Sequence, residues 1–379
     1  MAKNFGFPDK LNITLTCASG LEKTLKSELK RLGIDESPVE NGATTISASA
    51  LDVARFNLNL RTADRVYVNL KEFTAITFDQ LFEGVRSIEW ERYIPQDGRI
   101  TVNGKSVKSQ LYALSACQSI IKKAIAVRLT EKYSIRSLSE SGSEYGVVFW
   151  VFKDKVSILL NTSGQGLHKR GYRDLVGIAP IKETLASGLL LLSDFYYKNP
   201  FADPFCGSGT IAIEGARIAQ NIAPGINRRF AFNEWKNFDQ QLYYRCFEQA
   251  KDNEKRNTDV KIFASDIDPK AVKLAKHHAQ KAGVGDVIDF KVSDVKNFTC
   301  DLSGGTIVCN PPYGIRVYDR DEAEACYKSL RKVYDKLDNW SLYVITSAKN
   351  FEKQFGKKAD RTRKLYNSNE ECKYYYYLK

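Results

Sequence analysis

The chain has 379 residues, which is longer than one hydrophobic core usually grows, so more than one domain is expected. Hydrophobic residues make up 43% of it, and this share excludes an extensively disordered protein. The formal net charge of +12 favours a polyanionic partner such as RNA or DNA, although charge alone does not identify one.

The spacing of cysteine and histidine argues against a metal centre. The eight cysteines form no C-x-x-C pair, and only His277 and His278 are neighbouring histidines, so zinc-ligand spacing is absent. The longest apolar run, around Leu185 to Leu192, is far too short to cross a bilayer, and the first residues carry no signal-peptide pattern. We therefore expect a cytoplasmic protein with reduced cysteines, no metal and no membrane segment.

The first 65 residues alternate between strand and helix patterns. Apolar residues alternate from Leu11 to Cys17 as in a strand and recur at helical spacing from Gly20 to Leu32, with Ser19 placed to cap that helix. A second strand at Ala43–Ser47 and a helix at Ala50–Leu60 complete a small α/β unit. This unit does not resemble a Rossmann domain.

Residues 66–162 form a second predicted unit. Its elements are a helix Phe78–Ile88, a strand Arg99–Val102, a long amphipathic helix Ser109–Lys132, and a hairpin of strands Val147–Phe152 and Val156–Asn161. The long helix carries the cations Lys122, Lys123 and Arg128. They could form a solvated face above the core or contact RNA phosphates, and the pattern leaves both interpretations open.

The composition shifts at residue 163. Ser163–Gly166 is predicted to be a flexible joint, and after Gly171 helical patterns alternate with short buried strands. This alternation is typical of a parallel α/β sheet. We place the last domain at residues 163–379.

The segment FADPFCGSGTIAIEGA at Phe201–Ala216 predicts a strand, a tight turn and a helix. Gly207 and Gly209 would let the backbone approach a ligand closely at the start of the helix. The spacing Gly207-x-Gly209-x-x-Ala212 also fits a dinucleotide fingerprint, so the loop alone does not identify the cofactor.

Acids at the ends of the next strands narrow the choice of cofactor. The strand Val260–Ser265 ends in Asp266, farther along the chain than the roughly 20 residues that a dinucleotide fold requires. Asp266 could instead accept both ribose hydroxyls of an adenosine, whereas Asp268 is predicted to cap the helix Pro269–Ala282. Asp294, after the following strand, could accept from the adenine 6-amino group.

The motif NPPY at Asn310–Tyr313 follows a predicted strand at Thr306–Cys309. Because the carboxyl ends of parallel strands line one cleft, this loop is expected to lie beside Gly207 and Asp266. The two prolines fix the local backbone and supply no N–H donors, which leaves a cluster of acceptors. Cys309 is expected to pack within the strand rather than to act as a nucleophile.

These acceptors suit methyl transfer to an aromatic amine, whose lone pair is delocalised into the ring and is therefore a poor nucleophile. The Asn310 side-chain oxygen and the Pro311 carbonyl could take both amine hydrogens, draw the nitrogen toward tetrahedral geometry and aim its lone pair at a sulfonium methyl group. Tyr313 offers a ring for the base to stack on. The predicted catalytic residues are Asn310, Pro311, Pro312 and Tyr313.

The whole chain resembles the THUMP-domain class I RNA methyltransferases, in particular the bacterial 23S rRNA guanine-N2 methyltransferases. The resemblance is carried by HKRGYR at His168–Arg173, APIKETLA at Ala179–Ala186, DPFCGSGT at Asp203–Thr210, SDIDP at Ser265–Pro269 and NPPYG at Asn310–Gly314. It implies an S-adenosylmethionine cofactor, an RNA partner and, as the methyl acceptor, the 2-amino group of a guanine in 23S rRNA.

The resemblance also implies an architecture. An α+β part, made of a ferredoxin-like unit (1–65) and a THUMP module (66–162), would precede a Rossmann-like, seven-stranded methyltransferase domain (163–379). That sheet would end in an antiparallel hairpin of Thr362–Tyr366 and Lys373–Leu378. The Tyr374–Tyr377 run is then expected to pack within the sheet rather than to stack on RNA.

The candidate site residues combine the sequence patterns with this resemblance, which places Pro180–Thr184 over the cofactor. The expected cofactor contacts are Pro180, Glu183, Thr184, Asp203, Pro204, Cys206, Gly207, Gly209, Thr210, Asp266, Ile267, Asp294 and Asn310. The expected RNA contacts are Lys122, Lys123, Arg128, Lys169, Arg170 and Arg173.

Three other functions are compatible with the motifs. A tRNA guanine-N2 methyltransferase would share all of them. An adenine amino-methyltransferase acting on RNA or DNA uses the same acceptor geometry, although a DNA enzyme normally carries a region that reads base edges in the major groove. A non-catalytic RNA-binding factor is disfavoured because Gly207, Gly209, Asp266 and Asn310 are intact.

Overall fold

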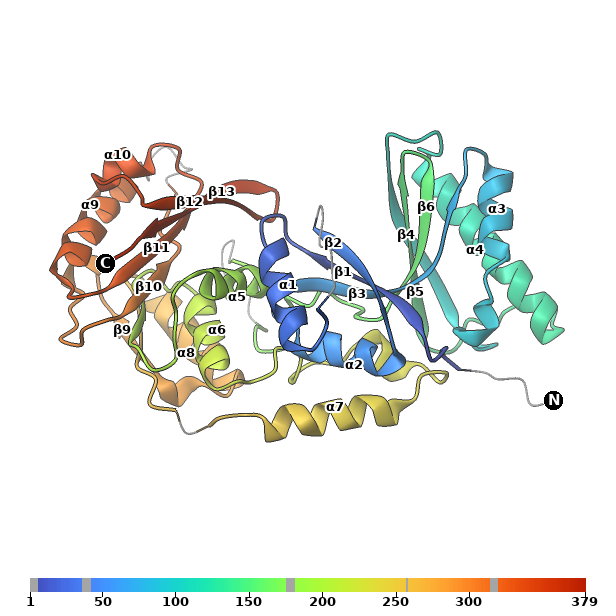
Figure 1. The fold of residues 1–379 in the computed structure, drawn as a ribbon, viewed down its shortest axis with the longest axis horizontal. Helices are drawn as coiled ribbons and strands as arrows, with labels where there is room; N and C mark the ends of the chain where they lie inside the picture. Colours follow the sequence, from blue (N-terminus) through green and yellow to red (C-terminus); the bar gives the residue numbers. More distant parts are fainter. Residues whose placement is uncertain (1–5, 36–41, 175–180, 257, 314–319) are drawn as a thin grey trace.

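The computed structural model describes residues 6–35, 42–174, 181–256, 258–313 and 320–379, apart from the side chains of residues 320–322. The chain folds into two parts, each built around one sheet (Figure 1). No described helix is long and apolar enough to cross a bilayer.

The first unit contains β1 (Leu11–Cys17), α1 (Glu22–Arg31), β2 (Ala43–Ala48), α2 (Ala50–Asn59) and β3 (Ala63–Thr74). The predicted strands and helices are present, but Ser19 does not cap α1, whose N-cap position is Leu21. The Glu22 carboxylate instead accepts the Gly20 N–H at 2.8 Å. Strand β3 is not predicted by the sequence pattern, because polar residues and a register shift between Asn69 and Lys71 interrupt its alternation.

The second unit contains α3 (Phe78–Arg86), a 3-10 turn η1 (Trp90–Arg92), β4 (Arg99–Val107), α4 (Leu114–Tyr133), β5 (Glu144–Phe152) and β6 (Lys155–Asn161). Helix α4 begins later than predicted, because Ser109 and Gln110 are engaged elsewhere. The Gln110 N–H donates to the Asp154 carboxylate at 2.7 Å, and the Asp154 N–H donates to the Ser109 hydroxyl at 3.0 Å.

Strand β3 joins these two units into one six-stranded sheet of order β2-β1-β3-β6-β5-β4. It pairs antiparallel with β1 along one edge and with β6 along the other. The predicted boundary between residues 65 and 66 therefore falls inside a strand that both units share. The segment Ser163–Gly166, predicted to be a flexible joint, begins at a residue that is fixed by hydrogen bonds. The buried Ser163 hydroxyl donates to Asn57 at 2.6 Å and accepts the Val66 N–H at 2.8 Å.

The C-terminal part alternates helices and strands, as predicted. It contains α5 (Glu183–Leu192), β7 (Phe201–Asp203), α6 (Thr210–Ala219), η2 (Ala231–Glu234), α7 (Gln240–Asp252), β8 (Ile262–Asp266), α8 (Pro269–Lys281), η3 (Gly285–Val287), β9 (Ile288–Val292), η4 (Val295–Asn297), β10 (Thr306–Cys309), α9 (Arg320–Lys336), β11 (Ser341–Thr346), α10 (Phe351–Phe355), β12 (Arg361–Asn367) and β13 (Glu370–Tyr377). The strand order is β12-β13-β11-β10-β7-β8-β9, and only β12–β13 and β13–β11 pair antiparallel. The predicted seven-stranded Rossmann-like sheet with its terminal hairpin is therefore confirmed.

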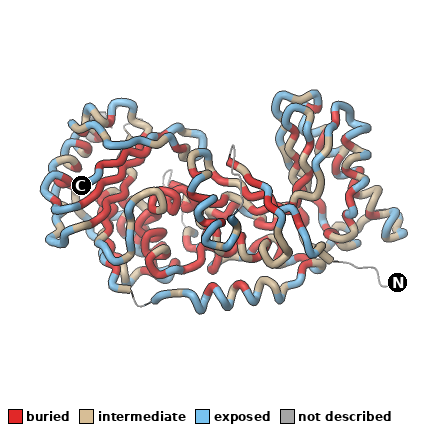
Figure 2. The backbone as a smooth tube through the Cα atoms, viewed as in Figure 1, coloured by how far each residue is buried: buried red, intermediate tan, exposed pale blue. Residues whose placement is uncertain are grey.

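The central strands β7, β10 and β11 of the second sheet are buried along their whole length (Figure 2). Tyr374 and Tyr376 pack into the core on the side of α5 and α6, whereas Tyr375 and Tyr377 pack into a separate core under α9 and α10. Successive residues of a strand point to opposite faces, so the four tyrosines serve both cores. Each is at most 4% exposed, and the structure agrees with the expectation that they pack within the sheet.

A buried carboxylate, Glu214 on α6, lies in a charged cluster that reaches the N-terminal part of the chain through Arg61. It accepts hydrogen bonds from Tyr172 at 3.0 Å and from Ser187 at 2.5 Å, and it lies 3.8 Å from Arg170. Burial raises the pKa of Glu214, but Arg170 and Arg217 outweigh it and hold the pKa below its ordinary value. Arg170, expected to contact RNA, is only 2% exposed and instead belongs to this internal cluster.

Replacing Glu214 by Gln should lower the free energy of unfolding by about 3–5 kcal/mol, because the buried arginines lose their counter-charge. Urea unfolding followed by circular dichroism measures this difference. The difference from wild type should shrink as the pH falls from 4.5, where Glu214 of the unfolded chain takes up a proton, toward the lower pKa of folded Glu214, where the native carboxylate also loses its charge. Glu83→Gln, whose side chain is 66% exposed beside Arg86, is the matched control and should change stability little. Equal stability of the Glu214→Gln variant and wild type would contradict this role.

Candidate functional site

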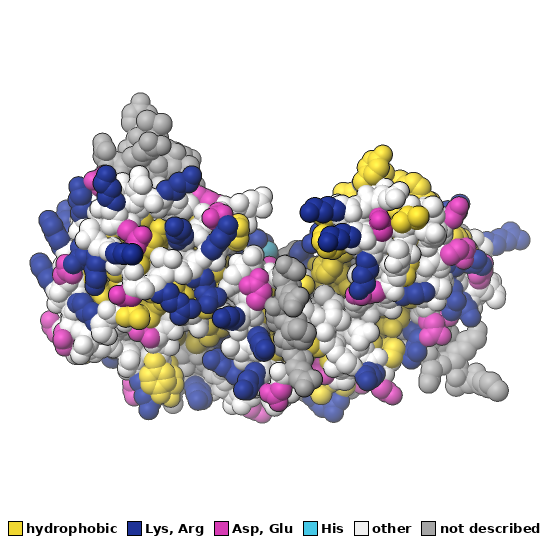
Figure 3. Space-filling view, turned by 45° about the horizontal axis from the view of Figure 1, so that its top comes forward, with side chains coloured by type: hydrophobic (Ala, Val, Ile, Leu, Met, Phe, Trp, Pro, Cys, Tyr) yellow, Lys and Arg dark blue, Asp and Glu magenta, His cyan; other side chains and the backbone are white. Residues whose placement is uncertain are grey.

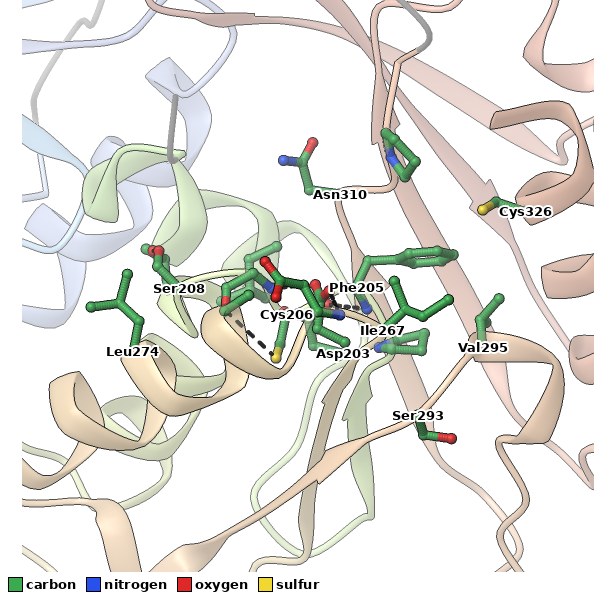
Figure 4. A pocket seen from close by; sticks show the side chains of 18 of the residues that line it. Asp203, Phe205, Cys206, Ser208, Ile267, Leu274, Ser293, Val295, Asn310 and Cys326 are labelled. Carbon is green, nitrogen blue, oxygen red and sulfur yellow. Dashed lines mark hydrogen bonds between the residues drawn. The ribbon is translucent and has the colours of Figure 1, made fainter. Parts of the chain in front are cut away.

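A cleft of about 610 Å³ lies at the carboxyl ends of β7, β8, β9 and β10. Of the predicted site residues, it is lined by Asp203, Pro204, Cys206, Gly207, Thr210, Asp266, Ile267, Asp294, Asn310 and Pro312. Figure 4 shows Asn310 and Ser293 at opposite ends of the residues drawn, with Ile267 between them. The fold thus brings the glycine loop, the strand-end acids and the NPPY motif to one place.

The two glycines of the loop have different roles. Gly207 has a φ of +49°, and a Cβ atom built there would meet nothing within 4 Å, so the space above it is open. Gly209 has a φ of +83°, and a Cβ atom there would lie 2.9 Å from the Cβ of Ala275. Gly209 therefore lets α6 approach α8, whereas Gly207 leaves room on the cleft side.

Asp266 connects the glycine loop to the end of β8. One carboxylate oxygen accepts the Gly207 N–H at 2.9 Å, and the other accepts the Asp268 N–H at 3.0 Å. Each oxygen of an ionised carboxylate can accept about two hydrogen bonds, so both retain capacity for a ligand. Asp268 caps α8 as predicted, since its carboxylate accepts the Lys270 N–H at 2.8 Å.

Asp203 is a buried acid in the wall of the cleft. It is 1% exposed; one carboxylate oxygen accepts the Phe205 N–H at 3.3 Å, and the other is buried without a partner among the described residues. Burial raises the pKa of Asp203 to about 8, and the nearby Asp266 contributes in the same direction. A cationic ligand beside Asp203 would stabilise the ionised form of this carboxyl group.

An apolar wall faces the acids. Ile267 is 70% exposed, although it is large and hydrophobic, and Ala271 and Leu274 line the same cleft from α8. Ala271 and Leu274 were missed by the sequence interpretation, although their separation of three residues places them on one face of α8. Asp294, at the far end, accepts the Lys296 N–H at 3.0 Å and forms an ion pair with its ammonium group.

The acceptors of the NPPY loop are themselves hydrogen-bonded. The Tyr313 hydroxyl donates to the Asn310 side-chain oxygen at 2.5 Å, and the Tyr327 hydroxyl of α9 donates to the Pro312 carbonyl at 2.7 Å. Tyr327 was not predicted and carries no local motif. Cys309 is buried on β10, and burial raises its pKa well above the ordinary value, which agrees with its predicted packing role.

The ring of Tyr313 does not lie where the sequence interpretation places it. It packs against the core near Cys372 of β13 and does not line the cleft, so in this conformation it is no platform for a base. Pro311 is buried and is likewise absent from the lining. Asn310 and Pro312 are the members of the motif that reach the cleft.

Several predicted cofactor contacts lie outside the cleft. Glu183 is 2% exposed and pairs with Arg173 at 3.1 Å, while the Thr184 hydroxyl donates to Asp64 of β3 at 3.2 Å. Both side chains therefore hold α5 in place rather than lining the cleft. Pro180 falls outside the described residues, and its neighbour Ile181 does line the cleft.

The cations expected to contact RNA differ in their surroundings. Lys122 pairs with Glu140 at 2.8 Å, and Arg128 donates twice to Glu91, at 3.0 and 2.6 Å. Lys123 and Lys169 are exposed, whereas Arg173 is held by Glu183. The described part of the chain contains no group of three or more His, Cys, Asp or Glu residues that could hold a metal ion.

Three family models match successive parts of the chain. Residues 12–67 match the RlmL ferredoxin-like domain, residues 75–161 match the THUMP domain, and residues 170–376 match the RMKL-like methyltransferase domain.

Individual relatives are similar over nearly the whole chain. YpsC of Bacillus subtilis (strain 168), which is named as an RNA methyltransferase, is 44% identical, and the match covers 97% of this chain and 96% of YpsC. A Listeria monocytogenes structure, described as a predicted N6-adenine-specific DNA methylase, is 43% identical with a TM-score of 0.93, covering 97% of this chain and 96% of that one. The structure of SMU.472, described as a methyltransferase complexed with SAH, is 37% identical with a TM-score of 0.94. The match covers 98% of this chain and 99% of that one. The chain therefore belongs to the THUMP-domain RNA methyltransferases with an RMKL-like catalytic domain.

Proposed function

We propose that this RNA methyltransferase transfers a methyl group to the 2-amino group of a guanine in ribosomal RNA. The observation that carries the proposal is the convergence of the Asn310 acceptor with the open glycine loop at Gly207 in one cleft. The methyl donor is S-adenosylmethionine, the cofactor of this class of enzyme, which supplies an electrophilic methyl group on a sulfonium.

The residues of the cleft fit this donor. The open space above Gly207 admits a ligand against the loop backbone, and the exposed Ile267 offers an apolar surface for an adenine ring. We assign Asp266 to the ribose hydroxyls, Asp294 to the adenine amino group and Asp203 to the cationic amino-acid end. Pro204, Cys206 and Thr210 complete the wall. The unpartnered oxygen of Asp203 is the strongest of these indications, because a buried polar atom without a hydrogen-bond partner is costly.

Asn310 is the group that activates the substrate nitrogen in this proposal. Its oxygen would accept one N–H of the target amine in place of the Tyr313 hydroxyl, and a loop carbonyl would accept the other. This localises the nitrogen lone pair as the N–C bond forms and the C–S bond breaks. The nitrogen becomes acidic as it is alkylated, so its extra proton can pass to solvent without a strong base.

The identity of the base, guanine, and of the RNA, ribosomal RNA, is the more specific part of the proposal. The name of the Listeria protein points to adenine in DNA, whereas the THUMP match and the name of YpsC point to RNA. Incubation with labelled S-adenosylmethionine and unmodified pools of ribosomal RNA, tRNA and DNA, followed by identification of the labelled nucleoside, separates these alternatives. We expect N2-methylguanosine from ribosomal RNA; N6-methyladenine from DNA would replace the proposal.

Replacing Asn310 by Ala should lower kcat by at least about 100-fold, because the acceptor acts mainly as the transition state forms. Affinity for S-adenosylmethionine should change little. Single-turnover methylation and calorimetric binding measure the two effects separately. Asn12→Ala, at an exposed position of β1, is the matched control. Full activity of the Asn310→Ala variant would remove Asn310 from the mechanism.

Replacing Tyr313 by Phe should tighten RNA binding, because the target amine no longer displaces a hydroxyl from Asn310. One hydrogen bond contributes about 1 kcal/mol net, so KM for RNA should fall by up to about fivefold. Steady-state kinetics at saturating cofactor measure the change. A raised KM would instead show that the Tyr313 hydroxyl contacts the substrate.

Cofactor affinity should rise with pH toward about 8. In the free protein Asp203 has a pKa of about 8 and is therefore largely protonated at lower pH, and only its ionised form attracts a cationic ligand. Binding then releases a proton, and the affinity rises by up to about tenfold per pH unit before levelling off above this pKa. Calorimetric titrations between pH 6 and 8.5 in buffers of different ionisation enthalpy count the proton. Asp203→Asn should remove this dependence; if it persists in the variant, another group is responsible.

A further inference from the structure

Among the described residues, no helix covers one face of the sheet in the THUMP part. Helices α3 and α4 pack on one face of β4, β5 and β6, where Tyr145, Val147, Phe149 and Val151 are buried (Figure 1). The alternate residues of β5 point the other way. Among them, Phe152 is 54% exposed and Trp150 is half-buried, with its ring 5.6 Å from that of Tyr67.

Lysines lie directly over these aromatic rings. The Lys105 ammonium is 4.9 Å from the centroid of Trp150, and the Lys153 ammonium is 5.5 Å from that of Phe152. Parallel pairing sets Lys105 opposite Trp150 and Val107, 46% exposed, opposite Phe152. We call Lys105, Val107, Trp150, Phe152 and Lys153 the open-sheet platform.

Two neighbouring cations on this face are paired with acids. Arg99 pairs with Glu144 at 3.0 Å, and Lys155 pairs with Glu72 at 2.6 Å. The platform lysines lie over rings instead, so the surface combines aromatic area with positive charge. Figure 3 shows Lys and Arg side chains beside hydrophobic ones on the right-hand lobe, next to the notch between the two lobes.

The platform is fixed relative to the catalytic part. Trp235, which follows η2, stacks on Tyr145 of β5 with ring centroids 5.0 Å apart and donates its indole N–H to the Glu144 carbonyl at 2.9 Å. Lys236 adds an ion pair to Asp97 at 2.5 Å. Because α3 and α4 lie on the outer side, the open face looks toward the methyltransferase sheet (Figure 1).

On the opposite, helical side most cations are paired with acids, although Lys123 of α4 is exposed. On α4, Lys122 pairs with Glu140 and Arg128 with Glu91, and Arg86 of α3 pairs with Glu131. A phosphate would have to compete with these carboxylates for its cation. The open sheet face is therefore the more favourable RNA contact of the two.

We propose that the open-sheet platform binds unpaired RNA bases by stacking them on Trp150 and Phe152, with Lys105 and Lys153 near the adjoining phosphates. Stacking on aromatic side chains combined with a basic surface is how proteins hold single-stranded nucleic acid. This inference rests on the proposed function, since it supplies the RNA contact for that catalytic cleft.

The test compares Phe152→Ala and Lys105→Ala with wild type in two assays. Fluorescence anisotropy measures binding of a labelled single-stranded RNA and of the same RNA in a blunt duplex. Methylation of the unmodified RNA pools is measured in parallel. Tyr244→Ala on α7 is the matched control, because Tyr244 is 55% exposed and Phe152 is 54% exposed. Melting temperatures establish that the variants are folded.

We expect Phe152→Ala to weaken binding of the single strand by about 5- to 150-fold, the range that loss of one stacked base implies, and to leave duplex binding unchanged. Tyr244→Ala should bind both RNAs as wild type does. Lys105→Ala should weaken the same binding and flatten its salt dependence. Wild-type affinity in both platform variants, with RNA methylation intact, would overturn the platform while the proposed function stands. Wild-type protein that neither binds nor methylates RNA would overturn both. A change in self-association without a change in RNA binding would identify the face as a protein contact instead.

Discussion

The relative placement of the two parts depends on one buried carboxylate, Glu214, and the three arginines around it. Arg61 enters from the end of α2, Arg170 from the segment after β6, and Arg217 from α6 itself. Removing charges from water is unfavourable unless they meet partners, so these segments are stable only in a narrow arrangement. Arg61 also donates to the Ile222 carbonyl at 2.8 Å, and its own N–H donates to Glu28 of α1. The N-terminal sheet is in this way fixed to the helix that follows the glycine loop.

The cleft depends on a second set of contacts, in which several polar groups of its loops already have hydrogen-bond partners. Asp266 holds the glycine loop, Tyr313 holds Asn310, and Tyr327 holds the Pro312 carbonyl. Hydrogen bonds of this kind set the loop geometry before a ligand arrives, which reduces the ordering that binding must bring about. In the proposed mechanism, the Asn310 oxygen exchanges the Tyr313 hydroxyl for an N–H of the substrate amine.

Most regular elements and the strand-end motifs follow from local sequence patterns. The glycine loop, Asp266 and Asn310 meet because parallel strands deliver their carboxyl ends to one edge, and the alternation of Tyr374–Tyr377 follows from strand geometry. The sequence pattern does not predict strand β3, because its polar residues face partners that only the assembled sheet provides. The roles of Arg170, Glu183 and Arg128 also depend on distant acids and bases, and no local signal marks those partners.

Because β3 lies at the centre of the first sheet, it determines which part of this protein could fold independently. A cut within β3 would leave β1 paired only with β2 and β6 paired only with β5, and each would present an unpaired backbone edge where β3 had been. Neither segment is therefore a self-contained domain, although each matches its own family. The smallest transferable RNA-binding module is the whole six-stranded sheet, and exchange of such modules among methyltransferases would have to move both segments together.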